Sequence, residues 1–302
     1  MSGAWTDYRA ALEDGKLDFS VVAKPAKVEI DDPYGTGFGS AIVTYEDVPG
    51  AQVNVDNNNR ILGCVSSQYG IIQNEQAFSL LEPLTLAGAV ITHVGMTEQG
   101  LCFMVAQWEM FSATGDDYCL DIMCTNSFNG NYPCGLIMTP RRIICQNMYR
   151  KISHDQLFHI RHMSLALKRI TEAKVNEHRI IGFIDDFTEI IDHANYCTMS
   201  AARYKELLEM LFPYPTNKEA ERYQTSKERV DRLRENFGDV YMNASDILKY
   251  KGTMLQFIHA YYDYLSHGEP GKNMPGDWNN KRLSALIGGT SVNTKLVKEL
   301  VK

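Results

Sequence analysis

The hydrophobic pattern of this chain changes its period near residue 164, and that change restricts the folds it can adopt. Before Ser164, apolar residues occur in short extended runs separated by Gly-, Asp- and Asn-rich turns, a pattern typical of antiparallel strands. From Ser164 onward, the spacing of apolar residues is helical. The sequence therefore predicts an α+β fold, with an N-terminal antiparallel sheet and packed helices followed by a helical C-terminal region.

Turn residues divide the N-terminal part into a series of expected strands. The segments PYGTGFG (33–39) and DNNN (56–59) are turn signals, and a hairpin is expected around the second. One short helix is expected at 74–84, with Asn74 as its cap. The expected strands cover 19–23, 27–30, 41–45, 52–55, 89–95, 101–109, 118–126, 135–139 and 157–162.

Pro140 follows one of these strands, and proline fits the first turn of a helix. We therefore expect a basic helix from Pro140 to Lys151. The helical part of the chain predicts further helices at 164–193, 201–212, 226–237, 244–265, 281–287 and 293–301. The expected organisation is an extended segment at 1–60, an α+β core at 61–195 and a helical region at 196–302.

The composition is that of a folded protein with a sizeable core, because 44% of the 302 residues are apolar. The polar N-terminus lacks the basic start and the apolar run of a signal peptide, and no apolar stretch reaches the ~20 residues that span a bilayer. The seven cysteines form no C-x-x-C pair, which agrees with a reducing compartment. We expect a soluble cytoplasmic protein without membrane contact.

The charge balance changes sign near residue 141. Residues 1–140 hold five Lys and Arg against seventeen Asp and Glu, whereas residues 141–179 hold nine against three. The remainder restores the overall net charge of −7. A basic island in an acidic chain indicates an anionic partner, because such a partner responds to the local potential. The alternative is a solvated helix face with an ordinary excess of cations.

The motifs of the common enzyme classes are missing from the sequence. There is no P-loop, no G-x-S-x-G and no H-E-x-x-H, and GTGFG (35–39) is interpreted as a turn. We therefore expect no enzyme activity, no cofactor and no metal. Three weaker alternatives stay open: a divalent metal at the acid pairs 31–32, 116–117 or 185–186, a thiolate–imidazole pair of Cys145 with His154, His159 or His162, and a zinc site at Cys119, Cys124 and Cys134.

The basic island offers the side chains of a single-strand binder, which combines cations for phosphates with rings that stack on bases. Lys174 adds a further cation within the island. Phe128 and Tyr132, in the preceding polar loop, are the expected stacking residues. The complete expected binding set is Arg141, Arg142, Gln146, Asn147, Tyr149, Arg150, Lys151, Arg161, Lys168, Arg169, Phe128 and Tyr132.

Several motifs in this chain resemble a known family. They are LDFSVVAKP (17–25), LGCVSSQYGIIQNEQAFSLLEPL (62–84), TNSFNG (125–130), TPRRIICQN (139–147), FHIRH (158–162), GTMLQFIHAYYDYLSHG (252–268) and RLSALIGG (282–289). The chain is similar to the phage/plasmid-like proteins that carry a large domain of unknown function. It departs from that pattern at Phe128, where the family has His, and at Asn129, where it has Asp. The order of elements also resembles, more weakly, single-strand annealing proteins of the Red-beta kind.

The resemblance implies a bacteriophage, prophage or plasmid protein in a bacterial host cell. Together with the basic island, it leads us to expect a DNA-metabolism protein that binds single-stranded DNA, or RNA, and assists annealing or recombination as a homo-oligomer. The alternative is an accessory or anti-defence factor that engages a host or phage protein, since an acidic surface can compete for a basic nucleic-acid site.

Overall fold

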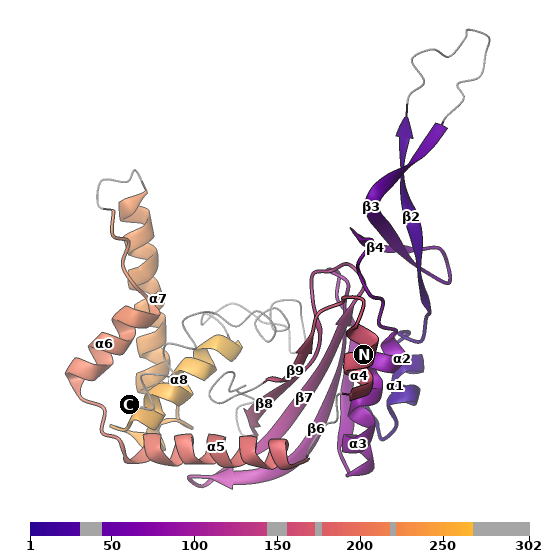
Figure 1. Cartoon of the computed structure of the whole chain (residues 1–302). Helices are drawn as coiled ribbons and strands as arrows, with labels where there is room; N and C mark the ends of the chain where they lie inside the picture. Colours follow the sequence, from indigo (N-terminus) through magenta and orange to yellow (C-terminus); the bar gives the residue numbers. More distant parts are fainter. Residues whose placement is uncertain (31–43, 144–155, 173–176, 218–221, 268–302) are drawn as a thin grey trace. The chain divides into compact units, whose positions relative to one another are not determined.

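The computed structural model describes residues 1–30, 44–143, 156–172, 177–217 and 222–267. The chain forms two compact units (Figure 1). Unit 1 comprises residues 1–107, 122–137 and 156–175, and unit 2 comprises residues 108–121, 138–155 and 176–302.

A six-stranded sheet has the strand order β1-β5-β6-β7-β8-β9. Its antiparallel neighbours include β1 with β5, β5 with β6, and β8 with β9. Three of the strands, β6, β7 and β8, contribute residues to both units. The strands are β1 (Ser2–Trp5), β5 (Val90–Met96), β6 (Leu101–Ala113), β7 (Asp116–Ser127), β8 (Cys134–Arg142) and β9 (Gln156–Ile160).

Short helices pack against the unit 1 part of this sheet. They are α1 (Tyr8–Asp14), α2 (Asn74–Phe78), the 3-10 turn η1 (Ser79–Leu81), α3 (Glu82–Leu86) and α4 (Ala166–Glu172). Helix α1 contacts α2 and β5, and Tyr8, Phe78 and Leu81 are fully buried. Asp7 caps α1 by accepting a hydrogen bond from the backbone N–H of Arg9. The expected cap Asn74 lies instead inside α2, which begins after Gln73.

A second, three-stranded sheet of unit 1 has the order β2-β3-β4. It consists of β2 (Val21–Ile30), β3 (Thr44–Asp56) and β4 (Ile61–Ser66). Strand β4 pairs with residues 51–55 of β3, whereas the earlier part of β3 pairs with β2 alone. We call residues 27–29 and 45–48 of this two-stranded part the arm. Figure 1 shows it as a long twisted ribbon.

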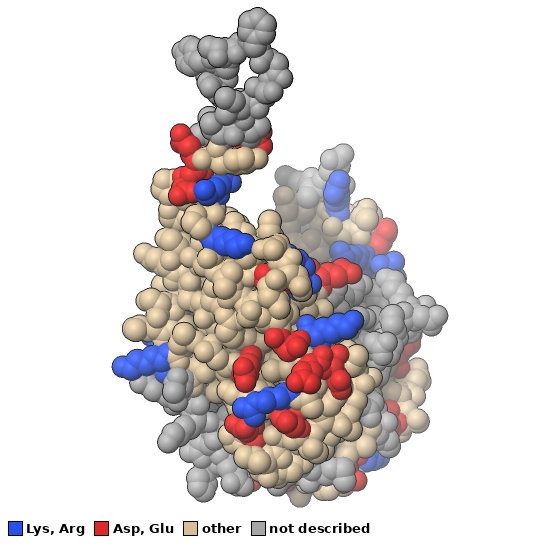
Figure 2. All heavy atoms as spheres, turned by 90° about the vertical axis from the view of Figure 1, so that its right-hand side faces the viewer, with Lys and Arg blue, Asp and Glu red and all other residues tan. Residues whose placement is uncertain are grey.

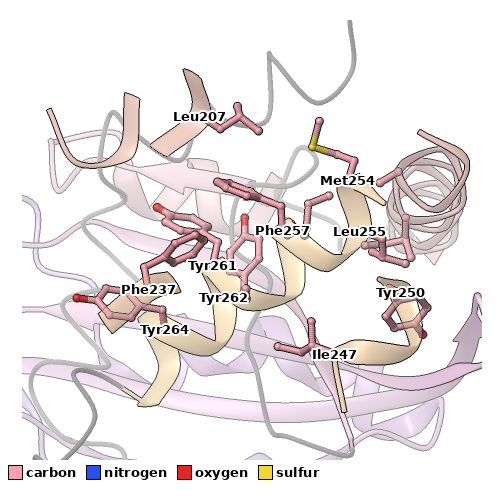
Figure 3. Close-up of a cluster of buried hydrophobic side chains, with 14 of the residues drawn as sticks. Leu207, Phe237, Ile247, Tyr250, Met254, Leu255, Phe257, Tyr261, Tyr262 and Tyr264 are labelled. Carbon is pink, nitrogen blue, oxygen red and sulfur yellow. The ribbon is translucent and has the colours of Figure 1, made fainter. Parts of the chain in front are cut away.

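Unit 2 contains the longer helices. They are α5 (Glu177–Tyr196), α6 (Ala201–Leu211), α7 (Tyr223–Asn243), the 3-10 turn η2 (Leu248–Tyr250) and α8 (Met254–His267). Helix α8 is buried on almost every side, and Leu255, Phe257, Ile258 and Tyr262 are all inaccessible (Figure 3). A helix that is buried on most of its faces belongs in a core, and here the polar Gln256 and His259 are buried with the apolar side chains. The ring of Phe237 on α7 lies 5.2 Å from that of Phe257, so aromatic contacts hold α7 on α8.

The α+β class, with helices towards the C-terminus, is confirmed. Two expected helices do not begin where the sequence predicts, at Pro140 and at Ala244, and residues 144–151 of the first lie outside the described part. Pro140 starts no helix, because strand β8 continues through it to Arg142. Proline fits this strand because β9 pairs only with residues 134–137 of β8, so no hydrogen bond to β9 requires an N–H at position 140. The helix expected at 244–265 is interrupted before Met254, where Gly252 adopts a φ of 83°.

The helix expected at 164–193 is divided into α4 and α5, and the residues that separate these two helices lie outside the described part. The helices expected at 281–287 and 293–301, and the turn at 33–39, also lie outside it.

Candidate nucleic-acid interface

The end of β9 leads into a segment that is basic and free of acids. Residues 159–170, here called the basic segment, contain Arg161, Lys168 and Arg169 but no Asp or Glu. All three cationic side chains are exposed, while Ile160 and Ile170 are buried and anchor the segment to unit 1. The nearest acids in the sequence are Asp155, before β9, and Glu172, at the end of α4, so the segment itself carries a local excess of positive charge.

The basic segment packs against Tyr69 and Gly70, which follow β4 in the sequence. The Tyr69 ring stacks on the His162 ring, with centroids 4.8 Å apart and planes 7° apart. The Gly70 N–H donates to the carbonyl oxygen of His162 at 3.3 Å, and Tyr69 forms an isolated β-bridge with Met163. A Cβ at Gly70 would lie 2.3 Å from the Met163 carbonyl oxygen, so the close approach requires glycine.

His162 itself adds no positive charge near neutral pH. Burial lowers the pKa of its imidazole to about 4, and the opposing effect of the Gly70 carbonyl does not compensate. The positive potential of the basic segment therefore comes from Arg161, Lys168 and Arg169.

Phe128 lies in the core rather than on the surface, which corrects its expected exposure as a stacking ring. Its side chain is 2% exposed and packs against Phe19, with ring centroids 5.8 Å apart. The loop is drawn inwards because its carbonyls are bound from neighbouring elements: Asn54 donates to Phe128 O at 2.8 Å and Tyr69 donates to Ser127 O at 2.8 Å. Tyr132, in the same loop, is half-buried.

Arg142 is also buried, contrary to its expected position on a basic surface. Its guanidinium, at 0% exposure, donates to Asp116 from Nε at 2.6 Å and to Asp246 from Nη1 at 2.7 Å. Asp116 accepts further hydrogen bonds from Lys249 and, at 2.6 Å, from Tyr250. Burial opposes ionisation of Asp116, but the hydrogen bonds from these donors outweigh it and lower the pKa of the carboxyl. Arg142 therefore serves the core of unit 2.

Arg141 is paired as well. Its Nε donates to Asp121 at 2.7 Å and its Nη2 at 3.4 Å, in a mostly buried contact. Burial tends to lower the pKa of the Arg141 guanidinium, but the negative charge of Asp121 outweighs this effect and raises the pKa. The charge of Arg141 is therefore balanced within unit 2.

The remaining expected residues fall into two groups. Gln146, Asn147, Tyr149, Arg150 and Lys151 lie outside the described residues, so their expected role stays a prediction. Arg161, Lys168 and Arg169 are described and are exposed on the basic segment. On the face shown in Figure 2, by contrast, Lys and Arg are dispersed among Asp and Glu. Arg9 of unit 1 lies 3.6 Å from Glu75 and 3.5 Å from Glu82.

Comparison with known families adds one finding. A family model described as Domain of unknown function (DUF932) matches residues 61–287. The chain belongs to the DUF932 family. No curated protein and no solved structure gave a significant match.

The DUF932 match includes a buried polar network that charge-based reasoning did not single out. The Asn126 side-chain amide donates to Asn74 Oδ1 and to Ile72 O, both at 2.9 Å, and Asn74 donates to Leu17 O at 2.9 Å. Both asparagines were visible in the sequence, in the QNEQAF and TNSFNG motifs. Their pairing joins α2 to β7 and thereby supports the loop that contacts Tyr69.

No three His, Cys, Asp or Glu side chains within the described part of this DUF932 protein are arranged to share a metal ion. The buried thiols of Cys124 and Cys134 are poor thiolates, because burial raises the pKa of Cys134 to about 12 and that of Cys124 well above its usual value. Cys124 donates instead to the Ala77 carbonyl at 3.3 Å. Cys145 and His154, of the expected thiolate–imidazole pairs, lie outside the described residues. Among the described residues, no helix is long and apolar enough to cross a membrane.

Proposed function

We propose that this DUF932 protein binds single-stranded nucleic acid through the basic segment and assists annealing or recombination in phage or plasmid DNA metabolism. The observation that carries the proposal is the exposure of Arg161, Lys168 and Arg169 on one short segment, where the next acid along the chain is Glu172 at the end of α4. Cations in such a setting attract a phosphate backbone without selecting a base sequence.

The rigid support of the segment favours binding over a passive solvated surface. Tyr69 and Gly70 hold its backbone in place, so less conformational entropy is lost when a strand binds. Exposed apolar side chains of the segment, such as Met163 and Leu165, offer contact area for base faces. With about three phosphate contacts on a single strand, the logarithm of affinity should fall against the logarithm of salt concentration with a slope of about −2.

The test is fluorescence anisotropy with a labelled single-stranded oligonucleotide over a series of salt concentrations. Arg161→Ala/Arg169→Ala should weaken binding and reduce the salt slope. The matched control is Lys205→Ala/Arg232→Ala, which removes two exposed cations from unit 2. Equal binding by the segment variant and wild type, or no binding by wild type at low salt, would refute the proposal. Substitution of Arg141 and Arg142 is a poor test, because both side chains are paired in unit 2.

A second candidate is an accessory factor that binds a basic protein surface. The observation that favours it is the row of acids Asp185, Glu189 and Asp192 on α5, whose spacing places them on one helix face beside His193. Tyr196, at the end of the same helix, is 86% exposed. Recovery of one stoichiometric host protein from lysate, lost on Asp185→Asn/Glu189→Gln and without oligonucleotide binding, would support this function instead.

A further inference from the structure

The arm is a two-stranded ribbon, and no third strand among those described pairs with it. Residues 45–48 of β3 pair with β2 only, since β4 begins its pairing at Ala51. A two-stranded hairpin is marginally stable alone, and proteins usually cover or blunt such edges. The arm is therefore a surface that benefits from a partner.

The arm is both apolar and acidic. Val28, Tyr45 and Val48 are between 37% and 59% exposed. Its charged residues are three acids, Glu29, Glu46 and Asp47, against the single cation Lys27, which lies 3.6 Å from Asp47. The partner of such a ribbon should supply apolar contact area and positive charge.

The basic segment has both properties. Met163, Leu165 and Leu167 are between 45% and 60% exposed, and they lie in the sequence between Arg161 and Lys168. Two arms would repel each other, because each has an excess of negative charge, whereas an arm and a basic segment attract. We infer that the arm of one copy docks on the basic segment of a second copy of this chain.

This contact joins two different surfaces, so it can be made reciprocally in a two-fold dimer or head to tail in a closed ring or an open chain of copies. The arm precedes the region matched by the DUF932 family model, whereas the basic segment lies within that region.

The assembly also bears on nucleic-acid binding, and this consequence rests on the proposed function. The carboxylates of a docked arm would form ion pairs with the same cations that bind phosphates. Oligonucleotide and arm therefore compete, and a bound strand should shift the protein towards smaller species.

The experiment is sedimentation velocity on the full chain with two charge-reversed variants. The arm variant is Glu29→Lys/Glu46→Lys, which leaves the Lys27–Asp47 contact intact, and the segment variant is Arg161→Glu/Arg169→Glu. Wild type should self-associate, and each variant alone should self-associate about tenfold more weakly, equivalent to about 1.4 kcal/mol. An equimolar mixture of the two should regain assembly, because every arm–segment contact in an alternating array is again between opposite charges.

The matched control is Glu235→Lys/Asp239→Lys on α7, which should assemble as wild type does. Assembly by the mixture shows that both variants are folded. A monomeric wild type, a mixture that stays monomeric, or a disulfide between two Tyr45→Cys arms in an otherwise unchanged chain would overturn the inference. Regained assembly without oligonucleotide binding would leave the inference standing and refute only the proposed function. If the wild type binds the oligonucleotide but the charge reversals leave its assembly unchanged, the inference is refuted and the proposed function stands.

Discussion

Arg142 and Asp116 form a buried ion pair, with Nε and Oδ2 2.6 Å apart and both side chains almost inaccessible. Asp246 is the second anion, 2.7 Å from the same guanidinium, and its backbone carbonyl accepts a further hydrogen bond at 2.9 Å. The pair therefore connects the β6–β7 turn region and the end of β8 to the residues that precede α8. Loss of Arg142 would take a charged donor from both carboxylates and leave the buried Asp116 with only Lys249 and Tyr250 as donors.

Arg142→Ala should therefore destabilise the protein by about 3–5 kcal/mol, the usual cost of breaking a buried pair from one side. Urea denaturation followed by circular dichroism measures the loss. Arg161→Ala, which removes an exposed cation, is the control and should change stability by less than about 0.5 kcal/mol. Similar midpoints for the two variants would contradict the structural role of Arg142.

The stability of the protein should fall between pH 6.5 and 4 in part because of His162. Burial lowers its pKa in the folded protein to about 4 from 6.5, so the unfolded chain binds more protons in that interval. Stability contributed by the neutral ring is thus complete above pH 6.5 and is lost as the pH falls, by up to about 3 kcal/mol.

His162→Phe keeps a ring against Tyr69 but removes the titration. Urea denaturation at pH 7.5, 5.5 and 4.5 measures the free energy of unfolding of both proteins. Between pH 7.5 and 4.5 this free energy should fall more for the wild type than for the variant. His259 is also buried with a lowered pKa and is present in both proteins, so the difference between them isolates His162. Parallel pH profiles would show that protonation of His162 is not coupled to folding.

Two glycine substitutions should have opposite effects. Gly70→Ala places a methyl group 2.3 Å from the Met163 carbonyl and should cost about 1–3 kcal/mol, because the backbone of the basic segment must shift. Gly182→Ala, on α5 with no atom within 4 Å of the added Cβ, should stabilise the protein by about 0.5–1 kcal/mol. Thermal melting of both variants provides the comparison. Equal melting temperatures would show that the contact of Gly70 with Met163 is easily relaxed.

The class of fold was predictable because it depends on local periodicity. The alternation in β5 and β6 and their TEQG turn identify that hairpin without knowledge of distant residues. The burial of Arg142 was not predictable in this way. Its partner Asp246 is 104 residues away, and an arginine that follows another arginine resembles part of an exposed basic surface. Phe128 was misplaced for a similar reason, since the polar loop around it is held inwards by Asn54 and Tyr69 from other strands.

The difference between Phe128 and Tyr132 provides a further test of the nucleic-acid proposal. Phe128→Ala should lower stability by about 3–5 kcal/mol, because it opens a cavity beside Phe19. Tyr132→Ala removes a half-buried ring from the loop next to Tyr69, and it should change stability much less. If Tyr132 stacks on a base, its removal should weaken oligonucleotide binding by about tenfold, since one stacked base contributes ~1–3 kcal/mol.

Anisotropy titrations at one salt concentration, with protein that circular dichroism shows to be folded, separate the two effects. The folded fraction of Phe128→Ala should bind with wild-type affinity. Wild-type affinity for Tyr132→Ala would exclude base stacking by this loop and leave the basic segment as the proposed contact with the strand.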